Sequence, residues 1–196
     1  MSRIRRRFDK AYYDRFYRNP STRASTPAAA KRLAAFIGAY LRYLELPPRS
    51  ILDIGCGTGS LLRALQREFP KARSHGLEVS DYLCRRSGWE QGSIADYDGA
   101  DFDLVVCNDV LPYLDDKSCN RALANIARAC RTASFIGVLT EEDLPHCDRA
   151  RTDAQQIVRP AQWYRRRLRK AFRNVGGGLY LKHPVPVAVW ALDALD

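Results

Sequence analysis

The stretch Ile51-Leu-Asp-Ile-Gly-Cys-Gly-Thr-Gly-Ser-Leu61 decides the fold expected for this chain. The short apolar run over residues 50–54 predicts a strand, and the apolar spacing within residues 60–69 predicts a helix. Between them, closely spaced glycines let the backbone turn sharply and approach a ligand without interference from Cβ atoms. The sequence therefore predicts a strand, a tight ligand-binding turn and a helix.

The same alternation continues along the chain. Helices are predicted over residues 28–44, 81–86, 117–130 and 160–172, and strands over residues 74–79, 91–95, 102–108, 134–139, 178–182 and 185–191. Strands that alternate with helices indicate a parallel sheet. The last two strands are expected to form an antiparallel hairpin joined near His183-Pro184. We therefore expect an α/β fold with a doubly wound, mostly parallel, seven-stranded sheet that ends in this hairpin.

The glycine loop departs from two common nucleotide-binding patterns. A dinucleotide fingerprint of the form G-x-G-x-x-G would need its third glycine at position 60, where this chain has Ser60 and carries Gly59 instead. A P-loop would need a lysine followed by serine or threonine, and the loop contains no lysine. The ligand is therefore expected to lack a pyrophosphate.

Two carboxylates indicate what the ligand carries instead. Asp53, two residues before the first glycine, suits a cationic group such as an amino-acid ammonium and would repel phosphate. Glu78, at the end of the second predicted strand, can accept two hydrogen bonds from a ribose diol. Together they predict a nucleoside joined to an amino acid.

Three motifs in this order resemble those of the class I S-adenosylmethionine-dependent methyltransferases, in the small-molecule or type 11 style. Residues 51–61 resemble motif I, Gly76-Leu-Glu78-Val-Ser resembles the ribose-binding strand end, and Phe102-Asp-Leu-Val-Val-Cys-Asn-Asp-Val-Leu-Pro-Tyr-Leu114 resembles the fourth motif. The likeness covers about residues 51–141. It implies the class I methyltransferase fold, with S-adenosyl-L-methionine as cofactor and S-adenosyl-L-homocysteine as product.

The resemblance also assigns the cofactor-binding residues. The glycine loop would line the cofactor through its backbone, Asp53 would face the methionine end, and Glu78 would hold the ribose. Family members often have Gly-Asp-Ala or Gly-Asp-Ile where this chain has Gly92-Ser93-Ile94-Ala95-Asp96, so either Asp96 or the pair Ser93 and Ile94 would contact the adenine. The expected set is Asp53, Gly55, Cys56, Gly57, Gly59, Glu78, Val79, Ser93, Ile94, Asp96, Cys107 and Asn108.

The expected chemistry needs no universal catalytic residue. Methyl transfer from a sulfonium is an in-line displacement that depends mainly on proximity and orientation. Asp109 and Tyr113 follow the fourth predicted strand and are candidates to orient the acceptor, although a capping role for Asp109 and a packing role for Tyr113 remain open. Family members often have an acidic residue and histidine where this chain has Pro112-Tyr113, so no general base is assigned there.

Candidate acceptor-binding residues come from three other segments. The aromatic and arginine-rich stretch over residues 12–23 is a candidate lid, with an amphipathic helix packed on the sheet edge as the alternative. Trp163 is a candidate to shape the substrate cavity, with core packing as its alternative. A nucleophilic pair of His146 and Cys147 is not expected. The expected substrate residues are Tyr12, Tyr17, His146, Arg159 and Trp163.

The 196 residues are expected to form one domain. Within it, residues 1–46 would be a helical lid and cover, residues 47–141 the cofactor-binding core, and residues 142–196 the substrate-side helix and hairpin. Because the sequence has little beyond the residues of the core fold, the leading prediction is methyl transfer to a small-molecule acceptor at oxygen, nitrogen or carbon. The alternatives are an RNA or protein methyltransferase, supported by a net charge of +10, and a non-catalytic S-adenosylmethionine-binding protein.

Composition adds three further expectations. The apolar runs fall short of the roughly 20 residues that cross a bilayer, and the basic N-terminus lacks the apolar segment of a secretory signal, so the protein is expected in the cytoplasm. Six scattered cysteines without a C-x-x-C pair indicate reduced thiols and no zinc site. No feature of the sequence indicates the oligomeric state.

Overall fold

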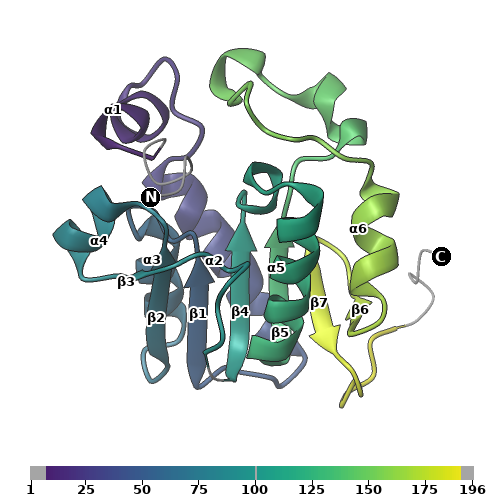
Figure 1. The fold of residues 1–196 in the computed structure, drawn as a ribbon. Helices are drawn as coiled ribbons and strands as arrows, with labels where there is room; N and C mark the ends of the chain where they lie inside the picture. The colour runs from purple at the N-terminus through teal and green to yellow at the C-terminus, as the bar shows by residue number, and fades with distance from the viewer. Residues whose placement is uncertain (1–7, 100, 191–196) are drawn as a thin grey trace.

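The computed structural model describes residues 8–99 and 101–190 and has one seven-stranded sheet at its centre (Figure 1). The strands are β1 (Ser50–Ile54), β2 (Arg73–Glu78), β3 (Glu90–Gln91), β4 (Phe102–Asn108), β5 (Cys130–Gly137), β6 (Phe172–Asn174) and β7 (Leu179–Lys182). Their order across the sheet is β3-β2-β1-β4-β5-β7-β6. The pairs among β1 to β5 are parallel, whereas β7 is antiparallel to both β5 and β6. The predicted fold class is confirmed.

Helices cover both faces of this sheet. The α-helices are α1 (Lys10–Tyr13), α2 (Pro27–Tyr43), α3 (Ser60–Glu68), α4 (Asp81–Ser87), α5 (Asp116–Ala129) and α6 (Ala161–Leu168). A π-helical turn, η1 (Asp14–Arg18), continues α1, and three 3-10 turns are η2 (Leu111–Tyr113), η3 (Glu141–His146) and η4 (Arg149–Arg151). No described helix has the length and apolar character needed to pass through a membrane.

Alternation along the central strands divides the core between the two faces. Leu52 and Val105 belong to the apolar cluster that includes the inward side of α5, whereas Ile51 and Leu104 belong to the cluster with α2 and α3. Successive side chains of a strand point to opposite faces. The apolar run over residues 50–54 is therefore buried at every position, as expected for a parallel strand covered on both faces.

The C-terminal hairpin differs from the prediction. The predicted helix over residues 160–172 ends at Leu168, and β6 (Phe172–Asn174) follows it and pairs with β7 through a turn at Gly176–Gly178. The predicted strand over residues 185–191 is wrong for residues 185–190, which form no strand, and Ala191 lies outside the described residues. Pro184 and Pro186 lack the N–H that a central strand donates, whereas three successive glycines with positive φ favour the earlier turn.

The third predicted strand is also shorter than expected. Only Glu90 and Gln91 pair with β2, and the chain then turns, with the Asp96 N–H donating to the Ser93 carbonyl at 3.0 Å. Ile94 and Ala95 are buried in this turn rather than in a strand. Residues 91–95 were predicted as a strand because they include apolar residues, and these residues are buried in a turn instead.

The carboxyl ends of β1, β2, β4 and β5 meet at one edge of the sheet, at the top of Figure 1. Two segments lie above this edge: the N-terminal helix α1 with η1, and the loop region that contains η3 and η4. In open α/β sheets this edge is where ligands bind.

Candidate functional site

The glycine loop after β1 takes a shape that requires glycine. Gly55, Gly57 and Gly59 have φ values of +65°, +54° and +73°, in the left-handed region. A Cβ atom on Gly55 would lie 2.4 Å from Cγ2 of Val110, and one on Gly59 would lie 2.5 Å from the Trp89 ring. The loop is therefore packed on its inner side and has no space for side chains there.

Glu78 fixes the loop from the end of β2. Its Oε2 accepts a hydrogen bond from the Gly57 N–H at 2.8 Å, and its Oε1 accepts from the Ser80 N–H at 2.9 Å and from the Tyr13 hydroxyl at 3.4 Å. Burial raises the pKa of Glu78, whereas these N–H donors favour its ionised form. The carboxylate predicted to hold a ribose thus also holds the loop.

Asp53 lies behind the loop with an unsatisfied acceptor. The residue is 3% exposed, and its Oδ2 has no hydrogen-bond partner in the described part of the chain. Burial, and then the nearby Glu78 carboxylate, raises the pKa of Asp53 to about 8. A buried acceptor without a donor fits the cationic end of a ligand, which would supply the missing hydrogen bond and stabilise the ionised carboxylate.

A cavity of about 680 Å³, including its open mouth, lies between the glycine loop and the N-terminal helix. We call it the cofactor cavity. Six of the predicted cofactor-binding residues line it: Gly55, Glu78, Val79, Ser93, Ile94 and Asn108. Asp53, Cys56, Gly57, Gly59, Asp96 and Cys107 are not among its lining residues. The lining combines carboxylate, backbone and apolar groups, as adenosyl binding requires.

Asp96 differs from the other predicted cofactor residues. Its side chain is 71% exposed and its Oδ1 pairs with Nη2 of Arg121 at 3.2 Å. Ser93 and Ile94, by contrast, line the cofactor cavity. The alternative in which Ser93 and Ile94 flank the adenine is thus the one the geometry favours, because the turn after β3 points Asp96 at α5.

The N-terminal aromatic segment covers the cofactor cavity. Phe8, Tyr12, Tyr13 and Tyr17 all line it, and their rings pack in series, with the Phe8 and Tyr12 centroids 4.9 Å apart and those of Tyr13 and Tyr17 5.2 Å apart. The sequence predicted a lid in this region but did not single out Phe8 or Tyr13. The four-residue spacing of Phe8 from Tyr12 and of Tyr13 from Tyr17 was the available signal.

A second cavity of about 1030 Å³, including its mouth, lies beside the first, between the N-terminal segment and the η3–η4 region. We call it the acceptor cavity. It shares five lining residues with the cofactor cavity: Tyr12, Tyr17, Asn108, Asp109 and Tyr113. The two cavities therefore meet at the carboxyl end of β4.

Hydrogen bonds join the residues at this meeting point. Gln156 donates from Nε2 to Oδ1 of Asp109 at 2.8 Å and to the Tyr113 hydroxyl at 3.2 Å. The Tyr113 and Tyr12 hydroxyls are 3.0 Å apart. Gln156 was not singled out from the sequence, because it comes from a loop 47 residues beyond Asp109.

Asp109 and Tyr113 differ in the proton chemistry they can support. Asp109 is open to the acceptor cavity, but surrounding protein atoms displace water from its carboxyl group and raise its pKa to about 6. Burial raises the pKa of Tyr113 to about 12, so its phenol stays neutral near neutral pH. Asp109 can therefore accept a proton, whereas Tyr113 can donate a hydrogen bond.

The remaining substrate candidates lie away from the acceptor cavity. Arg159 is 4% exposed and donates to Asp116, to the Tyr164 hydroxyl and to the Leu114 carbonyl. Trp163 stacks with Arg159 and Arg167, whose guanidinium carbons lie 4.8 and 3.5 Å from its ring centroid. Arg159 and Trp163 thus join α6 to α5. His146 ends η3 and is not among the lining residues, although the adjacent Cys147 is.

Comparisons with known proteins agree with this geometry. Residues 52–135 match the methyltransferase domain family. Over 110 residues the chain is 31% identical to the trans-aconitate 2-methyltransferase of Deinococcus radiodurans, which covers 52% of this chain and 42% of that protein. It is 34% identical over 62 residues to the malonyl-[acyl-carrier protein] O-methyltransferase of Legionella pneumophila, covering 32% of this chain and 22% of that protein. The chain thus spans less than half the length of these curated relatives.

Solved structures show the same fold. A sugar N-methyltransferase from Streptoalloteichus superposes with a TM-score of 0.53 at 27% identity, covering 66% of this chain and 55% of that one. The magnesium protoporphyrin IX methyltransferase of Synechocystis, solved with bound S-adenosylhomocysteine, superposes with a TM-score of 0.64 at 16% identity, covering 86% of this chain and 88% of that one.

The glycine loop and its two acids lie where open α/β sheets bind ligands. Residues 52–135 match the methyltransferase domain family, and the described residues share the Rossmann-like fold of class I S-adenosylmethionine-dependent methyltransferases.

Proposed function

We propose that this protein transfers a methyl group from S-adenosyl-L-methionine to a small-molecule acceptor. The single observation that carries the proposal is the meeting of the cofactor and acceptor cavities at Asp109 and Tyr113. A methyl donor in one cavity and an acceptor in the other would face each other at this junction. Proximity and orientation of that kind supply most of the rate in a direct displacement.

The residues fit the cofactor in three places. Asp53 would accept from the ammonium of the methionine end, Glu78 from the ribose diol, and Ser93 with Ile94 would flank the adenine. The bound cofactor supplies an electrophilic methyl group on its sulfonium. Around it, the rings of the N-terminal segment would exclude water, while Asp109 and Tyr113 would align the acceptor.

The relatives leave the acceptor atom open. They include a trans-aconitate 2-methyltransferase, a malonyl-[acyl-carrier protein] O-methyltransferase and a sugar N-methyltransferase. A small acceptor is supported by the position of the acceptor cavity, which lies beside the cofactor cavity and shares Asp109 and Tyr113 with it.

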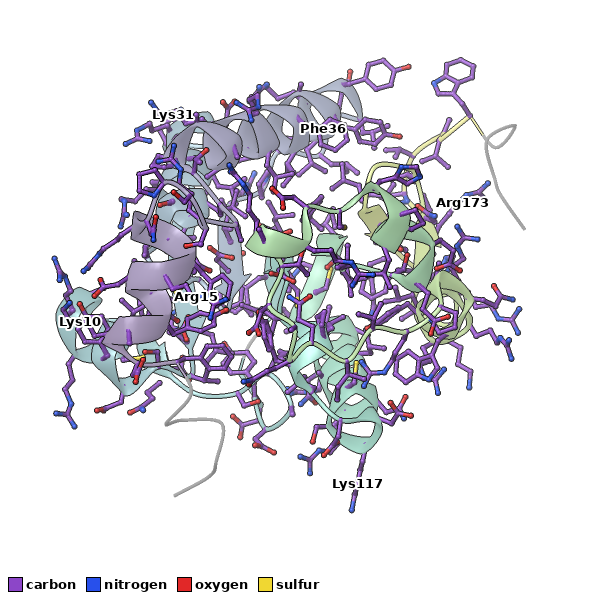
Figure 2. All side chains as sticks on the ribbon, turned by 90° about the horizontal axis from the view of Figure 1, so that it is seen from above. Lys10, Arg15, Lys31, Phe36, Lys117 and Arg173 are labelled. Carbon is purple, nitrogen blue, oxygen red and sulfur yellow. The ribbon has the colours of Figure 1, made fainter. Side chains whose placement is uncertain are left out.

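An RNA acceptor has one supporting feature, a groove between α6 and β6 lined by Arg165, Arg166, Arg169 and Arg173. This groove shares no lining residue with either of the other cavities. Other basic residues, such as Lys10 and Lys117, stand at the rim of the molecule in the view from above (Figure 2). The arginine-lined groove is therefore separate from the junction, and we favour the small acceptor.

The test combines binding and transfer. Calorimetry with S-adenosylhomocysteine should show one site per chain, and the Glu78→Ala variant should bind it more weakly. Incubation with methyl-labelled cofactor should transfer label to a small acceptor and not to RNA, and label transfer should persist at high salt. Absence of cofactor binding would contradict the proposal. Tight binding without transfer to any acceptor would favour the non-catalytic alternative.

A further inference from the structure

The acceptor cavity differs in charge from the protein as a whole. The chain carries a formal charge of +10, but the charged side chains that line this cavity in the described part of the chain are Asp109, Asp148, Asp153 and Arg151. Arg151 pairs through Nε with Oδ2 of Asp148 at 3.1 Å. The lining of this cavity therefore carries more carboxylates than guanidinium groups, and its guanidinium is engaged by one of those carboxylates.

Asp109 is the carboxylate held at the junction with the cofactor cavity. Its backbone has a φ of +57°, a strained conformation for a residue other than glycine, and its N–H donates to the Gly137 carbonyl at 2.8 Å. Gly137 in turn leaves room for Asn108, because a Cβ atom there would lie 2.1 Å from the Asn108 Oδ1. The backbone thus holds Asp109 in a fixed place between β4 and β5.

Gln156 fixes the carboxyl group itself. Its amide nitrogen reaches both Asp109 and Tyr113, and a flipped amide would turn its oxygen toward the carboxylate and lose the hydrogen bond to Asp109. In this orientation Oε1 of Gln156 is buried and has no donor among the described residues. The junction therefore has acceptor atoms in excess and needs donors from a ligand.

Aromatic rings surround the same point. Tyr12, Phe16, Tyr17 and Tyr113 line the acceptor cavity, and three of them also line the cofactor cavity. The negative faces of such rings attract cations, and more strongly where water is excluded. A carboxylate ligand would meet the Asp109 carboxylate and gain nothing from the rings, whereas an ammonium ion would be attracted by both.

We propose, building on the methyl-transfer function above, that the acceptor is a primary or secondary amine that enters as an ammonium ion and is held by Asp109 against these tyrosine rings. The ammonium gives one proton to the Asp109 carboxylate. The freed nitrogen lone pair then forms the bond to the methyl carbon, and the electron pair of the broken carbon–sulfur bond stays on sulfur. The positive charge moves from sulfur to the N-methylated product, and the Asp109 proton passes to water.

Matched ligands test this proposal without relying on turnover. Benzylamine, benzyl alcohol and benzoate share a ring and differ in the group offered to Asp109. Their dissociation constants are measured by ligand-observed NMR near neutral pH, on the full chain saturated with S-adenosylhomocysteine. We expect benzylamine to bind about ten-fold or more tightly than the other two, and Asp109→Asn to reduce this preference to about two-fold or less.

Glu45→Gln is the matched control, because Glu45 is an exposed carboxylate with a φ of +58° at the opposite edge of the sheet and should not affect the preference. Mass spectrometry of the product formed from benzylamine should show addition of one methyl group on nitrogen. Preference for benzoate, equal or absent binding of all three ligands, or an amine preference that survives in Asp109→Asn would overturn the inference. Failure of S-adenosylhomocysteine itself to bind would instead contradict the methyl-transfer function.

Discussion

The cofactor cavity and the acceptor cavity lie side by side above the same sheet edge, yet they are built differently. The glycine turn and the carboxylate beside the cofactor cavity come from short segments at the ends of β1 and β2, and the shape of the turn depends on backbone conformation. The acceptor cavity takes Tyr12, Asp109 and Gln156 from three distant segments, joined by side-chain hydrogen bonds. The comparison shows that the turn beside the cofactor cavity depends on neighbouring residues, whereas the junction residues of the acceptor cavity are brought together by long-range packing.

The largest effect is expected from Gly55→Val, which changes the backbone conformation of the glycine loop beside the cofactor cavity. The new side chain would overlap Val110 and distort the loop, so cofactor affinity should fall by about 100-fold or more, measured by calorimetry with S-adenosylhomocysteine. Gly88→Val is the matched control, since Gly88 also has a positive φ, +71°, but no atom within 4 Å of its Cβ position. Both variants should lose about 1–2 kcal/mol of stability from backbone strain. Equal loss of affinity in both would mean that global strain, not loop shape, determines binding.

Glu78→Ala should have the next largest effect, because it removes both a ligand contact and the support of the Gly57 N–H. Loss of charge-assisted hydrogen bonds costs about 1.5–3 kcal/mol, so the dissociation constant for S-adenosylhomocysteine should rise by roughly 10- to 150-fold. Glu90→Ala is the control, since Glu90 is 46% exposed and pairs with His75 on the same side of the sheet. An unchanged affinity in Glu78→Ala would contradict the predicted ribose contact.

Cofactor affinity should depend on pH through Asp53. The pKa of this group is raised to about 8, so it is largely protonated at neutral pH in the free protein and must lose its proton to pair with a cationic ligand. Affinity for S-adenosylhomocysteine should therefore rise by up to about ten-fold per pH unit as pH increases toward 8, and then level off. Calorimetry in buffers of different ionisation enthalpy should detect the released proton.

The same group gives an opposite trend in stability. A carboxyl group with a raised pKa in the folded state makes the folded protein bind more protons than the unfolded chain, so the free energy of unfolding of the cofactor-free protein should fall as pH rises from about 4 toward 8. Asp53→Asn should remove the contribution of Asp53 to both trends. If the pH dependence of binding survives in this variant, another group carries it.

The smallest effect is expected from Tyr13→Phe. Its hydroxyl donates to Glu78 over 3.4 Å, a long and therefore weak hydrogen bond, at the carboxylate oxygen that a ribose would use. Removing it should change the dissociation constant by less than about three-fold, toward tighter binding, because a competing donor is lost. A loss of affinity of ten-fold or more would show that Tyr13 binds the cofactor directly.

Residues 50–108 show how much local sequence can determine. β1 and β4 have the predicted bounds, and the loop glycines, Asp53 and Glu78 occupy the predicted places, because strand, turn and helix follow from spacing within about ten residues. The C-terminal hairpin could not be located in this way. Residues 185–190 have a strand-like composition, but β7 pairs with Phe172–Asn174, since glycines at 176–178 favour the turn and prolines at 184 and 186 disfavour a further strand.

The sequence by itself thus determined the central parallel strands, the glycine loop and the class of cofactor, because each depends on neighbouring residues and on backbone conformation. Tertiary structure decided which aromatic residues cover the cofactor cavity, that Arg159 and Trp163 join helices instead of lining a cavity, and that Gln156 meets Asp109. These contacts involve residues from 12 to 163 of the sequence. Local sequence periodicity cannot predict such contacts, because they form only when distant segments pack together.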